Sequence, residues 1–240
     1  MPHPISTPTL MLLAGLALGP AATAAVSTDI FVEPTTPGSG DSFGSSLAIG
    51  NSFFVSGAPT DDDVASNAGS ATVYFADPST GLPSFATLEA PMGLSAGANF
   101  GNVVAADEDT FIVSAPAQHN SVASPIGAVY VYTVGSSTIS LQAVLQPSTI
   151  IPSDLFGHDV DIVGDTIVVG APGSAGGEGS VFVYNRTMGD WSTGTELFGP
   201  HGADGDGFGW SVALDHDNEK RLLVGAPWDS DAGIHTGRIH

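Results

Sequence analysis

Short apolar segments alternate with turns rich in glycine and proline over almost the whole chain. Residues 159–163 alternate between acidic and apolar positions, whereas residues 166–170 are almost continuously apolar. Alternation predicts a strand with one buried face, and a short continuous run predicts a strand covered on both faces. Beyond the amino-terminal segment, no window of a dozen residues has the 3.6-residue period of an amphipathic helix. The pattern therefore predicts an all-β protein built from short strands.

The same succession of segments occurs four times, at intervals of 52 to 57 residues. Each copy opens on a Phe-Gly pair and has a Gly-Ala-Pro turn farther along, which is Ser-Ala-Pro in the second copy. The openings are at Phe43, Phe100, Phe156 and Phe208, and the turns begin at Gly57, Ser114, Gly170 and Gly225. A fixed period of about 50 residues indicates that each copy is one supersecondary unit of a repeat architecture.

The hydrophobic period and the turn residues place up to four strands in each copy. The expected strands are residues 45–49, 53–56, 71–75 and 85–89 in the first copy, 103–105, 110–114, 128–133 and 141–145 in the second, 159–163, 166–170, 180–184 and 195–198 in the third, and 211–214 and 222–225 in the fourth. The fourth copy stops at residues 237–240, where its third strand should begin. Residues 28–33 are one more expected strand, equivalent to the last strand of a repeat.

Four antiparallel strands repeated at this length are typical of a propeller blade. A solenoid of β-strands would have shorter repeats, and a β-sandwich would not repeat in its sequence. The Phe-Gly opening, the Gly-Ala-Pro turn and the following Gly-x-x-x-Val-Tyr strand, as at residues 179–184, resemble FG-GAP repeats, the blade type of the integrin α-subunit head. The resemblance covers residues 41–240, with repeats at about 41–98, 99–154, 155–206 and, incomplete, 207–240.

Propellers of this family usually have seven blades. The resemblance therefore implies an all-β FG-GAP β-propeller with three complete blades plus part of a fourth, in an incomplete seven-bladed ring. In this interpretation the chain is truncated and further blades follow residue 240. In the alternative interpretation, the strand at residues 28–33 completes the fourth blade, and a small four-bladed ring closes.

The first 25 residues have the features of a signal peptide. Residues 10–18 form an apolar core, Pro20 breaks it, and residues 22–24 make a small-x-small cleavage site. A membrane anchor is the rival interpretation, but the apolar run is short. We expect a mature propeller at residues 26–240 that is secreted, or periplasmic or on the cell surface in a bacterium, without membrane insertion after cleavage.

Composition excludes several classes of partner and chemistry. Four Lys and Arg residues against 25 Asp and Glu give a net charge of −21, which would repel nucleic acids and anionic lipids. The chain has no cysteine, so disulfides, thiolate catalysis and cysteine metal sites are excluded. A hydrophobic content of 42% favours a folded protein over a disordered one.

A metal site is suggested by the fourth copy, whose first hairpin is longer than those of the other copies. In FG-GAP blades that bind calcium, this hairpin carries oxygen ligands at alternating positions, which Asp215, Asp217 and Glu219 match. Lys220 occupies the turn position that is normally glycine, and no further carboxylate completes the shell. The resemblance thus implies Ca²⁺ at these three residues, and the alternative is a solvated acidic turn.

Other acidic and aromatic residues have structural interpretations. Asp41, Asp154 and Asp206 recur two residues before Phe, so we expect turn residues that bond local amides rather than catalytic groups. Residues 61–63, and Asp229 with Asp231, are expected in solvated loops. Trp191, Trp210 and Trp228 are expected to fill space between sheets rather than to line a sugar-binding face.

Asn185 begins an N-glycosylation sequon, which would carry a glycan in a secreted eukaryotic protein. The seven histidines have no zinc-ligand spacing, and no catalytic cluster interrupts the repeats. We therefore expect a non-enzymatic interaction or adhesion module that binds an extracellular protein or glycan through propeller loops. The alternatives are a non-catalytic propeller domain of a secreted hydrolase and a carbohydrate-binding propeller.

Overall fold

The computed structural model describes residue 32 and residues 38–76, 83–89, 94–118, 126–135, 138–200, 202–215, 221–232 and 236–240. The expected signal peptide and nearly all of the expected strand at residues 28–33 lie outside these ranges. Within them, no helix has both the length and the apolar character needed to cross a bilayer.

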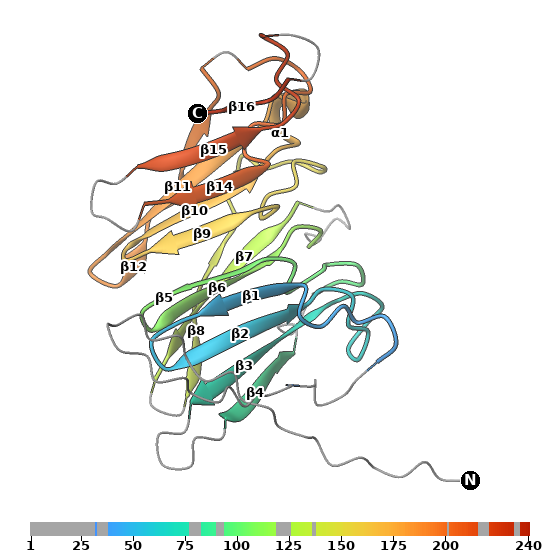
Figure 1. Ribbon diagram of the computed structural model, residues 1–240, viewed down its shortest axis with the longest axis vertical. Helices are drawn as coiled ribbons and strands as arrows, with labels where there is room; N and C mark the ends of the chain where they lie inside the picture. The colour runs from blue at the N-terminus through green and yellow to red at the C-terminus, as the bar shows by residue number, and fades with distance from the viewer. Residues whose placement is uncertain are drawn as a thin grey trace, which may run out of the picture.

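The described residues form four antiparallel sheets (Figure 1). Consecutive strands are neighbours in each sheet, except that β13 of the third sheet pairs with β11 rather than with β12. The first sheet contains β1 (Ser46–Ile49), β2 (Phe53–Ala58), β3 (Ser70–Ala76) and β4 (Pro83–Glu89), and the second contains β5 (Val104–Asp107), β6 (Thr110–Ala115), β7 (Ala128–Val134) and β8 (Ile139–Leu145). The third contains β9 (Val160–Val163), β10 (Thr166–Ala171), β11 (Ser180–Thr187), β12 (Asp190–Trp191) and β13 (Thr195–Phe198), and the fourth contains β14 (Ser211–Leu214), β15 (Leu222–Ala226) and β16 (Arg238–Ile239). The expected antiparallel blades are confirmed, with four strands described in each of the first two sheets, five in the third and three in the fourth.

Two details differ from the sequence-based expectation. The strand β11 extends three residues farther than expected and pairs with β12, which was not expected at all. A four-residue helical segment, α1 (Ser174–Gly177), lies between β10 and β11. Its Ala175 and Gly176 have φ angles of 50° and 79°, so α1 is a tight loop rather than a regular helix.

The four sheets lie side by side in an open row, with the first and fourth sheets at opposite ends (Figure 1). The first strand of each sheet, β1, β5, β9 or β14, lies against the first strand of the next sheet. The last two sheets are also joined through one side chain of β9 and one that directly precedes it. Asp159 Oδ2 accepts a hydrogen bond from the Val212 amide at 2.8 Å, and Asp161 Oδ2 accepts one from the Leu214 amide at 2.7 Å.

Three hydrophobic clusters fill the spaces between consecutive sheets. Each contains the residue two positions before the Gly-Ala-Pro or Ser-Ala-Pro turn of one sheet and the residue four positions after the Phe of the next. The pairs are Val55 with Val104, Ile112 with Val160, and Val168 with Val212. Burial of each such side chain contributes about 1.5–3 kcal/mol to the stability of the folded state. Because one such pair recurs at every junction, the sequence repeat reflects the repeated core between sheets.

The motifs that define the repeat are also contacts between sheets. A side chain at Gly57 would collide with the carbonyl of Gly101, and one at Gly170 with the carbonyl of Gly209. Gly179 forms a parallel bridge with Phe208. The Phe-Gly pairs of the second, third and fourth repeats are therefore in contact with the sheet that precedes them, and the glycines permit that close approach.

Candidate functional site

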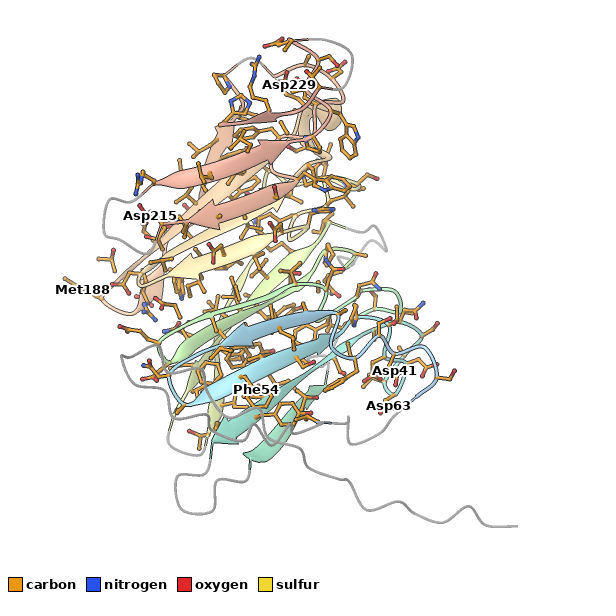
Figure 2. All side chains as sticks on the ribbon, viewed as in Figure 1. Asp41, Phe54, Asp63, Met188, Asp215 and Asp229 are labelled. Atoms are coloured by element: carbon orange, nitrogen blue, oxygen red, sulfur yellow. The ribbon has the colours of Figure 1, made fainter. Side chains whose placement is uncertain are left out.

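The hairpin expected to bind calcium follows β14. Figure 2 shows Asp215 and Met188 on the opposite side of the row from Asp41 and Asp63. Asp215 is mostly buried, and its Oδ2 lies 2.7 Å from both Nε and Nη2 of Arg221. Asp217 and Glu219 lie outside the described residues, so the calcium site stays a prediction. Asp215 would have to exchange its arginine partner for the metal.

The acidic residues before each Phe behave as the sequence predicts. Asp41, Asp154 and Asp206 are buried. The Oδ2 atom of each accepts a hydrogen bond from the amide three residues earlier, at 2.5, 2.8 and 2.8 Å. Burial raises the pKa of the Asp154 carboxyl, and the bond from Ile151 partly opposes that rise. These carboxylates are confirmed as turn residues.

The sequence predicts that the acidic residues after Gly-Ala-Pro lie in solvated loops. The prediction holds for Asp62 and Asp63, which are exposed. The expectation is wrong for Asp229, which is 3% exposed. Its Oδ1 accepts a hydrogen bond from the Asp231 amide at 2.9 Å, and Arg238 lies 3.5 Å from its Oδ2. Asp61 is also half-buried and accepts a hydrogen bond from the Ser70 hydroxyl at 2.5 Å. The first acidic position of each loop therefore fixes the loop.

The glycosylation sequon lies near the end of β11. The Asn185 side chain is exposed, and its Oδ1 accepts a hydrogen bond from Thr166 at 3.3 Å. Its backbone amide donates to the Ser192 hydroxyl at 3.0 Å. The position is accessible to solvent, and its glycosylation stays a prediction.

Two of the three tryptophans lie on the surface, so the expectation that they fill the core is wrong for them. Trp210 and Trp228 are 38% and 39% exposed. Their rings meet edge to face with centroids 4.5 Å apart, and the His158 ring lies 4.1 Å from that of Trp210. His158, Trp210 and Trp228 thus form an aromatic cluster.

The backbone holds the aromatic cluster in place. His158 Nδ1 lies 3.0 Å from the carbonyl oxygen of Trp210, which links the third repeat to the fourth. The Trp228 amide donates to the Asp206 carbonyl at 3.3 Å, and Gly207 leaves room for the ring, because a Cβ there would lie 2.7 Å from it. The cluster therefore presents aromatic surface in a fixed arrangement at the loops that carry Phe-Gly and Gly-Ala-Pro.

A positional signal for this cluster exists in the sequence. Trp210 directly follows Phe-Gly, and Trp228 directly follows Gly-Ala-Pro. The equivalent residues of the other copies are Ser45, Asn102 and His158, and Thr60, Ala117 and Gly173. Small or polar residues at both positions in the other copies indicate that these positions are exposed to solvent. A tryptophan at either position is therefore expected on the surface, where it departs from the pattern of the repeat.

Trp191 lies in a different place, at a groove of about 450 Å³ between β8 and the β11–β12 hairpin. Its indole N–H donates to Gln142 Oε1 at 2.9 Å, and the Arg186 guanidinium lies 5.2 Å from its ring centroid. Tyr184 forms part of the wall. Its buried hydroxyl has no hydrogen-bond partner among the described residues, and burial raises its pKa, as does the nearby Glu196. The groove combines an aromatic ring with amide and hydroxyl groups, a lining that suits a small polar ligand.

Comparison with known families identifies the repeat. A family model described as FG-GAP repeat matches residues 35–74, 86–132, 139–184 and 191–240. From the second match on, each matched range starts in the outer strands of one sheet and ends in the third strand of the next. The family unit therefore includes the junction between two sheets, where the Phe-Gly contacts lie. A search of curated proteins finds no match to this chain.

Proposed function

The chain belongs to the FG-GAP repeat family, and we propose that it is an exported, non-catalytic module that binds an extracellular protein through its aromatic cluster. Propellers of this family commonly bind ligands and are typical of extracellular or surface proteins. The single observation that supports this site is the pair of exposed, edge-to-face rings of Trp210 and Trp228.

Two physical arguments favour a protein ligand. Tryptophans that are held rigidly and still exposed are the side chains that most often dominate protein interfaces, because they bury a large area at small entropic cost. The net charge of −21 favours a partner with basic residues around its apolar contact.

The acidic residues of the described ranges give little support to catalysis. The two described carboxyl groups with a raised pKa, in Asp154 and Asp159, owe the rise to burial and also accept backbone hydrogen bonds. Asp154 holds a turn, and Asp159 joins β9 to β14. Both are engaged in structure rather than directed at a substrate.

The proposal can be tested with arrays of extracellular proteins and glycans. We expect the purified chain to bind protein targets, and the Trp210→Ser/Trp228→Ala variant, which carries residues found in other copies, to lose at least tenfold in affinity. Its melting temperature should fall only slightly, because the rings are partly exposed and their ring contacts are with each other and with His158. Trp191→Ala is the matched control.

The outcomes separate the possible sites. Unchanged binding by the double variant would exclude the aromatic cluster. Binding of glycans that is lost only in Trp191→Ala would place a carbohydrate ligand in the groove instead. Hydrolysis of an ester, glycoside or phosphoester that tracks one acidic residue would overturn the non-catalytic assignment.

We also propose that the fourth-repeat hairpin binds Ca²⁺ through Asp215, Asp217 and Glu219. A ligand that binds only the folded state must stabilise it, by about 2.7 kcal/mol at one hundred times its Kd. Calcium is therefore expected to raise the melting temperature, and Asp217→Asn is expected to reduce the rise. Equal midpoints with calcium and with EDTA would contradict this proposal.

A further inference from the structure

The groove of about 450 Å³ beside Trp191 lies at the junction between the second and third sheets, away from both ends of the row. One wall is β8, the last strand of the second sheet, and the other is the hairpin formed by β11 and β12. The volume falls within the range of about 300–1,000 Å³ that is typical of small-ligand sites. The lining includes six residues with polar or aromatic side chains, which are Gln142, Gln146, Tyr184, Asp190, Trp191 and Thr193.

Trp191 is held in place by groups of both sheets. Its indole N–H donates to Gln142 Oε1 on β8 at 2.9 Å. The Arg186 guanidinium lies over its ring, 5.2 Å from the centroid, and Arg186 Nε in turn donates to Asp165 Oδ1 at 2.6 Å. The ring is half-buried, so part of it is open to the groove. A fixed aromatic face attracts C–H groups of a ligand, because the face carries partial negative charge.

Two glutamines each use one end of the side-chain amide within the protein. Gln142 Oε1 accepts from Trp191, and Gln146 Nε2 donates to the Gly127 carbonyl at 2.7 Å. Gln142 Nε2 and Gln146 Oε1 have no partner among the described residues, so a donor and an acceptor of fixed direction remain. The buried Tyr184 hydroxyl in the wall also lacks a partner there, although buried polar groups nearly always have one. The groove therefore offers hydrogen bonds that the described protein groups leave unused.

The charges around the groove favour an uncharged ligand. Among the described residues, its lining contains the carboxylate of Asp190 and no Lys, Arg or His, so an anion would be repelled. A cation on the Trp191 ring would be repelled by the Arg186 guanidinium that already lies over that ring. A neutral ligand with several hydroxyl groups avoids both penalties, because its hydroxyls can donate to the Asp190 carboxylate.

We propose that this groove binds a neutral sugar, with one pyranose ring packed on Trp191 and its hydroxyls bonded to Gln142, Gln146 and Asp190. A pyranose has an apolar C–H face and a rim of hydroxyls, which match the aromatic ring and the amide and carboxyl groups of the groove. The aromatic cluster lies at the junction of the third and fourth repeats. The two sites are therefore separate, and the sugar site does not depend on the protein ligand proposed for the aromatic cluster.

Saturation-transfer NMR of the full chain with methyl glycosides of neutral hexoses tests the proposal. We expect binding of at least one of them, with an affinity that falls at least tenfold in Trp191→Ala and about threefold in Asp190→Asn. The uronic acid and amino-sugar analogues of the best-bound glycoside are expected to bind at least about threefold more weakly, because each adds a repelled charge. Leu141→Ala, on β8 but outside the groove lining, is the matched control and should bind like the wild type.

Circular dichroism and melting curves establish that the variants fold. Asp190 is exposed, so Asp190→Asn keeps the test decisive even if loss of the Trp191 ring destabilises the chain. Failure of every neutral glycoside to bind, unchanged affinity in a folded groove variant, or tighter binding of a charged analogue would overturn the proposal. Loss of sugar binding in Trp210→Ser/Trp228→Ala would also overturn it, because the sugar would then belong to the aromatic cluster.

Discussion

Replacing Phe156 with alanine is expected to destabilise the protein by about 3–5 kcal/mol. Phe156 is fully buried in the cluster between the second and third sheets, where its ring meets that of Phe182 edge to face at 5.4 Å. Its carbonyl also lies against Gly127 of the preceding sheet. Truncation therefore leaves a cavity in a junction that its neighbours cannot readily close.

Phe43 is the matched control, because it occupies the same motif position in the first repeat. Phe43 is only half-buried, and no described sheet precedes it, so we expect Phe43→Ala to cost a fraction of the Phe156→Ala value. Urea denaturation of both variants measures the difference. Equal losses would mean that the ring stabilises its own sheet rather than the junction.

The second large effect concerns the glycine of Gly-Ala-Pro. Gly170→Ala is expected to cost about 1–3 kcal/mol, because the new methyl group would overlap the carbonyl of Gly209 and force the third and fourth sheets apart. Neither Gly170 nor Gly225 has a positive φ, so alanine is not strained by the backbone at either position. Only the neighbouring sheet distinguishes the two glycines.

Gly225→Ala is therefore the control for Gly170→Ala. The nearest atom to a Cβ at Gly225 is the Ser211 hydroxyl, which can rotate away, so we expect a change within about 0.5 kcal/mol. The second repeat shows how a junction accommodates a side chain. Ser114 occupies this position, and a Cβ on Gly157 would lie 3.3 Å from the Ala128 carbonyl, which indicates a wider junction. A Gly170→Ala variant as stable as the wild type would contradict the tight contact.

The strands could be predicted from the sequence because their period and turns are local signals. Gly50-Asn51 and Gly164-Asp165 mark hairpins, and the apolar runs before Gly-Ala-Pro mark the second strand of each sheet. The strand β12 was missed for an equally local reason. Its turn has positive φ at both Met188 and Gly189, 54° and 94°, and methionine is not a residue that signals such a turn.

The candidate site was predicted less well, because its parts depend on contacts between residues that are distant in the sequence. Because large aromatic side chains are usually buried, the sequence predicted core positions for Trp210 and Trp228. The small or polar residues at the equivalent positions of the other copies indicate instead that these two positions lie on the surface. Burial of Asp229 depends on Arg238, which belongs to the next strand. The exposure of the rings becomes visible only by comparison of the copies, and the burial of Asp229 depends on a residue nine positions farther along the chain.

Contacts between the repeats also arrange the four described sheets as an open row, and the strand at residues 28–33 that would complete a four-bladed ring lies almost wholly outside the described residues. The sequence alone left a closed four-bladed ring as an alternative to an open part of a larger one. In the structure the first and fourth sheets lie at opposite ends of the row, with Leu47 and Leu223 exposed (Figure 1).

Small-angle X-ray scattering of residues 38–240 tests the open row most directly. A compact domain of this length would have a radius of gyration of roughly 17 Å. The open row predicts a larger radius and a pair-distance distribution with a long tail at large distances. A symmetric distribution with a radius near that compact value would contradict it and indicate a closed ring.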